Sequence, residues 1–246
     1  MEPLTHLVVM SRAPLAGQTK TRLIPALGAE GARAFHVTCL QDVLRACTQW
    51  RQERVAQGHV SPVLHLAITP PDSTEAFRAT GIAWPADARL EPQRGATLEA
   101  RMEHALEAVR KGHPQDQALL IGCDLPLLRA AHLHHALRAL ETAPVVLGPA
   151  EDGGYYLVGL GGGIAAKGLL ASQSHPGVPP LEAVQRNLRA RGLLWARMDT
   201  LPDADTPEDL RQILLHPLAR GESLSHSLRW LREHLPASFR EERLPA

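Results

Sequence analysis

The sequence has few cysteines, few aromatic residues and no excess charge of either sign. Its 26 Lys and Arg residues balance 26 Asp and Glu residues, whereas proteins that bind nucleic acid usually carry a basic excess that neutralises phosphates. We therefore expect no nucleic-acid partner, and any anion recognition must be local. The cysteines are odd in number and lack a metal-ligand spacing, so we expect buried, reduced thiols at three positions: Cys39, Cys47 and Cys123.

Long apolar stretches are also missing. No run of about 18 apolar residues could span a bilayer, so we expect no membrane span. The first residues lack the basic region, apolar core and cleavage site of a signal peptide, which makes the cytoplasm the expected location. A chain of 246 residues that is 44% hydrophobic can bury a core without disulfides, so one globular domain is expected.

Short apolar runs alternate with segments of helical periodicity. The strands are expected at residues 6–10, 63–68, 118–123, 145–147, 155–160 and 193–198, and the helices at 29–47, 98–109, 130–140, from 206 onward and over 224–235. This alternation predicts an α/β fold with a mainly parallel central sheet. We expect a nucleotide-binding part over about 1–126, an acceptor-side part over about 127–215, and a C-terminal helical tail over about 216–246.

A basic loop follows the first strand and carries Arg12, Gly17, Lys20 and Arg22. Arg binds phosphate oxygens in a fork and Lys acts as a point charge, so these side chains suit a diphosphate. The loop is not the glycine-rich phosphate loop of nucleotide triphosphatases, because Thr19 precedes Lys20 and the required earlier glycine is absent. A solvated basic loop remains the structural alternative.

Two aspartates are candidate metal ligands. Asp124 directly follows the most continuous apolar run, where open α/β sheets bind ligands. A carboxylate there suits Mg²⁺ or Mn²⁺, although Asp124 could instead cap the next helix. Further along, Thr206 and Asp209 have the positions of helix-capping residues, which leaves Asp205 free as a second metal ligand if the fold brings it to Asp124.

An acidic pair followed by two glycines lies between two expected strands: Glu151, Asp152, Gly153 and Gly154. The carboxylates could bind an acceptor hydroxyl or act as a general base. The glycines also favour a type I′ hairpin turn, because they readily adopt positive φ angles, and from chemistry alone the hairpin is the favoured interpretation.

Taken together and in this order, these segments resemble bacterial proteins of the GT-A superfamily that are described as glycosyltransferases of an uncharacterised-domain family. The resemblance covers most of residues 6–214, and its most specific parts lie at residues 17–23, 121–126, 148–160 and 205–210. It implies a nucleotide-diphospho-sugar transferase fold, related to small nucleotidyltransferases. By this similarity Arg12, Lys20 and Arg22 face nucleotide phosphates, whereas Asp124 and Asp205 hold the metal.

The resemblance also implies that residues 151–154 line the acceptor side, with Asp124, Asp152 and Lys20 as the catalytic candidates. The leading hypothesis is metal-assisted transfer of a sugar from a nucleotide-activated donor to a small-molecule acceptor. A second hypothesis is nucleotidyl transfer from a nucleoside triphosphate to a small phosphorylated acceptor, with release of pyrophosphate. A third is a catalytically silent module that binds nucleotides or proteins.

Overall fold

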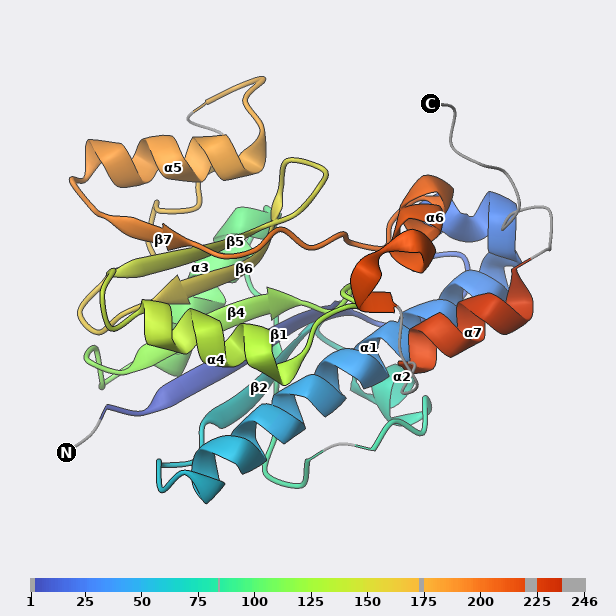
Figure 1. Cartoon of the computed structure of the whole chain (residues 1–246), viewed down its shortest axis with the longest axis horizontal. Helices are drawn as coiled ribbons and strands as arrows, with labels where there is room; N and C mark the ends of the chain where they lie inside the picture. The colour runs from blue at the N-terminus through green and yellow to red at the C-terminus, as the bar shows by residue number, and fades with distance from the viewer. Residues whose placement is uncertain (1–2, 84, 173–174, 220–224, 236–246) are drawn as a thin grey trace.

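The computed structural model describes residues 3–83, 85–172, 175–219 and 225–235, and it has a central sheet covered by helices (Figure 1). Within these residues the sheet has seven strands in the order β3-β2-β1-β4-β6-β5-β7. Strand β6 is antiparallel to its neighbours β4 and β5, and the other neighbouring strands in this sheet are parallel. The strands are β1 (Thr5–Arg12), β2 (Val63–Thr69), β3 (Arg89–Pro92), β4 (Gln117–Gly122), β5 (Val145–Pro149), β6 (Tyr155–Leu160) and β7 (Trp195–Arg197).

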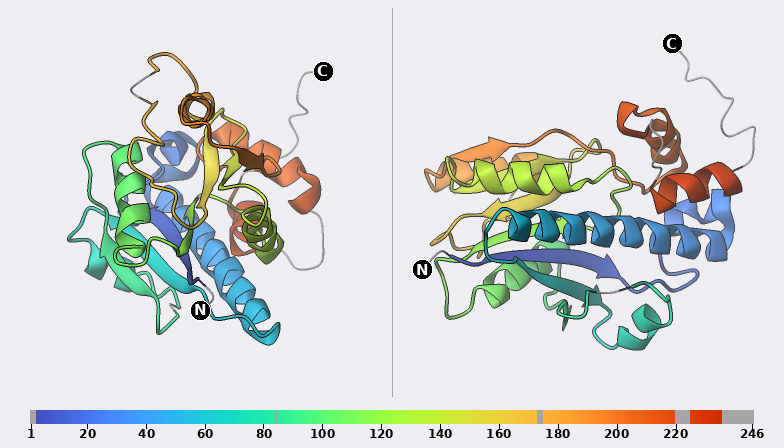
Figure 2. Two further views of the ribbon diagram at one scale, coloured as in Figure 1. Left: turned by 90° about the vertical axis from the view of Figure 1, so that its left-hand side faces the viewer. Right: turned by 60° about the horizontal axis from the view of Figure 1, so that its bottom comes forward.

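Helices cover both faces of this sheet, as the end-on view in Figure 2 shows. One core lies between the sheet and helices α1 and α4, and a second lies between the opposite face and α3 and α5. Because β4 is buried from both sides, its side chains after Gln117 are apolar. The helices are α1 (Ile24–Ala56), α2 (Thr74–Arg78), α3 (Leu98–Val109), α4 (Ala130–Ala139), α5 (Pro180–Ala190), α6 (Pro207–Leu215) and α7 (His226–His234).

The expected α/β fold with a mainly parallel sheet is confirmed, and the structure adds elements that the pattern did not predict. Strand β3 and helices α2 and α5 were not expected, and none of the described helices is long and apolar enough to cross a membrane. The closing helix is α7, which begins at His226, whereas Leu224 lies outside the described residues. Parts of the expected tail, residues 220–224 and 236–246, lie outside them as well.

The first helix has a break that positions the loop before it. Gly28 has φ 70° and ψ 167° inside α1, so a short N-terminal piece meets the long helix at a kink. Glycine adopts this backbone conformation without the steric penalty of a side chain. The long part after Gly28 carries the buried apolar side chains predicted for residues 29–47, and it continues to Ala56.

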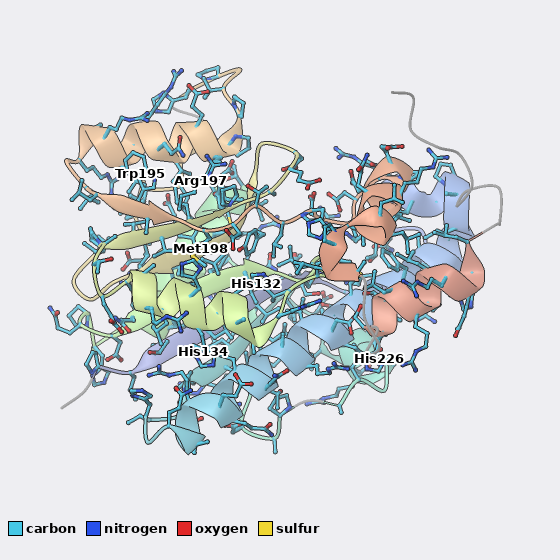
Figure 3. All side chains as sticks on the ribbon, viewed as in Figure 1. His132, His134, Trp195, Arg197, Met198 and His226 are labelled. Carbon is cyan, nitrogen blue, oxygen red and sulfur yellow. The ribbon has the colours of Figure 1, made fainter. Side chains whose placement is uncertain are left out.

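Helix α7 packs against α1 through one buried aspartate. The Asp42 carboxylate of α1 accepts hydrogen bonds from the backbone nitrogens of His226 and Ser227, at 2.7 and 2.8 Å, and from the Ser227 hydroxyl at 2.5 Å. Figure 3 shows His226 where α7 begins, beside α1. A negative charge at this helix end satisfies amide groups that have no partner within the helix.

We expect Asp42→Ala to lower the free energy of unfolding by about 3 kcal/mol, because it leaves three donors, the two of Ser227 buried, without their charged acceptor. A chain of this size then melts about 6–12 °C lower. Urea and thermal unfolding measure the effect, with Gln41→Ala on the same helix as control. Asp42→Asn keeps an acceptor oxygen and should lose less, and a loss of under about 1 kcal/mol for Asp42→Ala would contradict this role.

Candidate active site

A pocket of about 610 Å³ opens where β1 and β4 end side by side in the middle of the sheet. The chain leaves β1 toward β2 on one side and returns later as β4 on the other, so this is a point where the strand order reverses. Open α/β sheets bind ligands at the carboxyl ends of strands at such points. The pocket lining brings together Arg12, Lys20 and Arg22 with Asp124 and Asp205.

The basic loop after β1 is held in shape by its own hydrogen bonds. The buried Thr19 hydroxyl donates to the carbonyl of Ala13 at 2.5 Å and accepts from the Leu15 amide at 3.3 Å. Lys20 follows in a left-handed conformation with φ 52°, which is uncommon for a residue with a side chain. This backbone turns the Lys20 side chain inward, where only 3% of it is exposed.

The Lys20 ammonium joins two distant segments of the chain. Its nitrogen lies 2.9 Å from Asp124 Oδ2 and 2.8 Å from Asp205 Oδ1, and it donates to the carbonyl of Ala204 at 2.7 Å. These three contacts match the three donors of an ammonium group. In this structure, therefore, the ammonium faces the two aspartates, and its predicted contact with phosphates remains a prediction.

The charges of this group stabilise each other. Burial alone raises the pKa of Asp124, but the positive charge of Lys20 lowers it more, so the net pKa lies well below its usual range. For Lys20, burial lowers the pKa, yet the two carboxylates raise it above its usual value. Lys20 and Asp124 are therefore both charged at neutral pH.

Asp124 does not cap the helix that follows it. Helix α4 begins at Ala130 with Arg129 as its N-cap, whereas the backbone carbonyl of Asp124 accepts a hydrogen bond from the Ala204 amide at 3.1 Å. The Asp124 side chain instead lines the pocket and is 35% exposed. The alternative that Asp124 caps the next helix is therefore wrong.

The segment before α6 delivers Asp205, and its capping residues behave as predicted. Thr206 accepts a hydrogen bond from the Asp209 amide at 3.2 Å, and the Asp209 carboxylate accepts from the amides of Asp205 and Thr206 at 3.0 and 2.6 Å. Asp203 lies two residues before Asp205. Burial and the nearby carboxylates of Asp152 and Asp205 raise the pKa of Asp203 to about 6. Negative charge is therefore concentrated on this side of the site.

Residues 151–154 lie in the loop of a β5–β6 hairpin, so the hairpin is confirmed. The expected type I′ turn is wrong, because residues 150–154 separate the two strands and only Gly153 among them has a positive φ, whereas a type I′ turn has two such residues. The Gly154 amide donates to Asp152 Oδ1 at 2.7 Å, and Gly153 has φ 85°. None of these four residues lines the 610 Å³ pocket, although the next two, Tyr155 and Tyr156, do. Asp152 is therefore outside the pocket lining although it lies near Asp203, and its acceptor-side role remains a prediction.

Several pocket residues carry no functional signal in the sequence. His36 and Cys123 have the spacing of core residues, and both are buried in the pocket floor. Gln93 holds the neighbouring strands by donating to the carbonyls of Ser11 and Ala67, at 3.1 and 2.8 Å. Arg101 also lines the pocket, and its Nε donates to the Gly95 carbonyl at 3.0 Å.

Comparison with solved structures defines the class of fold. The chain superposes with a TM-score of 0.79 on a protein from Desulfovibrio desulfuricans that is provisionally described as a nucleotide-diphospho-sugar transferase, at 23% identity over 94% of this chain and 95% of that one. A cytidylyltransferase from Leptospira borgpetersenii matches with a TM-score of 0.53, at 11% identity over the whole of both chains. The protein therefore has the fold of nucleotide-diphospho-sugar transferases and nucleotidyltransferases.

Sequence comparison identifies the family within this class. Residues 53–172 match the model of a family described as uncharacterised proteins conserved in bacteria (DUF2064). A 3-phospho-D-glycerate guanylyltransferase from Phenylobacterium zucineum is 32% identical over 159 residues, which cover 62% of this chain and 67% of that protein. The chain belongs to this bacterial family, as the sequence resemblance implied.

Proposed function

We propose that the protein is a metal-dependent nucleotidyltransferase that moves the nucleotidyl group of a nucleoside triphosphate onto a small phosphorylated acceptor. The observation that carries this proposal is the pocket itself, in which arginines and a pair of aspartates meet at the carboxyl ends of β1 and β4. Its volume of about 610 Å³ lies within the usual range for small-molecule sites. Opposite charges that line one pocket suit a polyphosphate with its counterion.

The two aspartates fit a hard divalent cation. One oxygen of Asp124 and one of Asp205 lie within 3 Å of the same nitrogen, that of Lys20, so their carboxylates converge on one cation. Asp124 is 35% and Asp205 42% exposed, so further oxygens remain accessible from the pocket. Asp124 and Asp205 would hold Mg²⁺ or Mn²⁺, which when bound neutralises charge on the triphosphate.

In the proposed reaction a phosphate oxygen of the acceptor attacks the α-phosphorus of the nucleotide. The bond from the α-phosphorus to the bridging oxygen breaks, and its electron pair leaves with pyrophosphate. Arg12 and Arg22 line the pocket beside the aspartates, where their guanidinium groups stabilise the charge that grows on the leaving group. Lys20 keeps the two carboxylates in position.

Sugar transfer from a nucleotide-diphospho-sugar uses the same fold and was the leading hypothesis from the sequence. The relative that is 32% identical is a guanylyltransferase, which favours nucleotidyl transfer over sugar transfer. The structural match that favours a sugar donor has 23% identity and supports the fold alone. Nucleotidyl transfer is therefore the function that we propose.

Product analysis tests this proposal. The full chain is incubated with Mg²⁺ or Mn²⁺, each of the common nucleoside triphosphates and a panel of phosphorylated acids, with 3-phosphoglycerate included. We expect acceptor-dependent release of pyrophosphate. Release of a nucleoside diphosphate from nucleotide sugars would contradict nucleotidyl transfer and show that the protein transfers sugars. A rise in melting temperature with nucleotide but without any product would show that the protein binds nucleotides and does not catalyse transfer.

A further inference from the structure

Three side chains of different chemistry meet at the floor of the pocket. His36 comes from α1, and Cys123 and Asp124 follow β4, and one ligand atom from each lies within 4.8 Å of the other two. The Cys123 sulfur is 3.3 Å and the His36 Nδ1 is 3.6 Å from Asp124 Oδ1. This is the oxygen of Asp124 that does not face Lys20. The cluster therefore shares Asp124 with the proposed magnesium ligands and uses the Asp124 oxygen that Lys20 leaves free.

These distances match the edges of a tetrahedral coordination sphere. Zinc lies about 2.3 Å from sulfur and about 2.0–2.2 Å from nitrogen or oxygen, so tetrahedral ligands are roughly 3.3–3.6 Å apart. The separations of 3.3 and 3.6 Å from Asp124 Oδ1 fall within that range. The third separation, between Cys123 and His36, lies within 4.8 Å, so both side chains already have a zinc-like distance to Asp124 and an ion would set their distance to each other.

The imidazole of His36 is oriented as a metal ligand would be. Its Nε2 lies 3.1 Å from the backbone carbonyl of Arg12, an acceptor, so Nε2 carries the proton in that contact. The neutral ring then has a lone pair on Nδ1, which is buried and has no hydrogen-bond partner among the described residues. Metal-binding histidines commonly have their other nitrogen fixed by such a carbonyl.

We propose that the protein binds one Zn²⁺ ion through His36 Nδ1, Cys123 Sγ and Asp124 Oδ1, with the fourth position open to the pocket. Imidazole and thiolate ligands favour zinc, whereas magnesium favours oxygen ligands and keeps much of its water. All three residues line the pocket, so an ion can reach them from solvent. Binding replaces the thiol proton of Cys123, which leaves to solvent as the sulfur–zinc bond forms.

The site has a regulatory consequence, which rests on the proposed function. Zinc at Asp124 Oδ1 draws this carboxylate toward the pocket floor and adds positive charge beside the place of the magnesium ion. The two ions then oppose each other's binding, because like charges close together repel. Zinc is therefore expected to inhibit nucleotidyl transfer, and added magnesium should reduce the inhibition.

Cobalt(II) absorption of the full chain tests the zinc site without any assay of activity. Co²⁺ replaces zinc in such sites, and a cysteine ligand gives an intense thiolate-to-cobalt charge-transfer band. We expect this band at one Co²⁺ per chain, its disappearance on addition of one equivalent of Zn²⁺, and its absence in Cys123→Ala. Cys47→Ala is the matched control, because Cys47 is also a buried free thiol but does not line the pocket.

Two results with cobalt would overturn the zinc site: no charge-transfer band in the wild-type chain, or an equal band in Cys123→Ala. His36→Gln, with folding checked by thermal melting, should weaken zinc binding measured by calorimetry at least tenfold, and unchanged binding would overturn the site as well. A positive cobalt result together with no transfer product leaves the zinc site standing and overturns only the proposed function.

Discussion

Asp124→Asn is expected to lower kcat/KM for pyrophosphate release by about 10³-fold, the largest effect of any single substitution that we propose. The side chain keeps its size and can still accept a hydrogen bond from Lys20, but it loses the charge that would hold the metal. A loss of about 10³-fold corresponds to about 4 kcal/mol of transition-state stabilisation, as is typical when one electrostatic group of a preorganised site is removed.

Steady-state kinetics with saturating Mg²⁺ measures this effect, and a thermal melt confirms that the variant is folded. The matched control is Asp72→Asn, since Asp72 is exposed, follows β2 and lies outside the pocket lining. We expect Asp72→Asn to retain wild-type kinetics. If Asp124→Asn stays within tenfold of wild type with the same metal requirement, Asp124 is not the metal ligand.

Lys20→Met is expected to cause the largest loss of stability within the site. The Lys20 side chain is only 3% exposed, and its removal leaves Asp124 and Asp205 facing each other without a cation. Breaking a fully buried ion pair costs about 3–5 kcal/mol. Both carboxylates are about a third exposed or more, so solvent screens their repulsion, and we expect a loss of about 2 kcal/mol.

That loss corresponds to a melting temperature about 4–8 °C lower for a chain of this length. Lys111→Met serves as the control, because it removes the same charge from an exposed position in the turn after α3. Equal melting temperatures for Lys20→Met and the wild type would show that the ammonium does not hold the two carboxylates together.

The pH dependence of the difference in stability between wild type and Lys20→Met identifies the charged groups that Lys20 stabilises. Folding lowers the pKa of Asp124. The contribution of Asp124 to the free energy of unfolding is therefore complete above its unfolded pKa of about 3.9 and is lost as the pH falls below that value. Folding raises the pKa of Lys20, so its contribution is complete below about 10.4 and is lost at higher pH. In Lys20→Met, burial is left to raise the pKa of Asp124, so the stability gap between wild type and variant should be widest near neutral pH and narrow as the pH falls into the acidic range.

Much of the fold is predictable because local pattern and burial agree. The short apolar run at residues 118–123 favours a strand covered on both faces, and all of it but Cys123 lies in β4 in the middle of the sheet. The spacing of apolar residues likewise places α1, α3 and α4. Strand β6 carries a similar apolar run but runs antiparallel, since its direction is set by the short hairpin loop after β5.

The site is only partly predictable, because its key contacts link positions far apart in the chain. The sequence indicates that Lys20, Asp124 and Asp205 belong to one site, and the structure does bring them together. No local pattern says that the Lys20 ammonium turns inward, which depends on the left-handed backbone of that residue. The sequence likewise gives no sign that His36 lines the pocket, because its helical spacing is that of a core residue.

The contact between Lys20 and the carbonyl of Ala204 spans 184 positions of the chain. Contacts of such long range form late in folding, because a large loop must close before they add any stability. We therefore expect the segment that carries Asp205 to complete the pocket after the strands have paired. If the chain binds nucleotides as proposed, nucleotide binding during refolding should recover later than the helical circular dichroism.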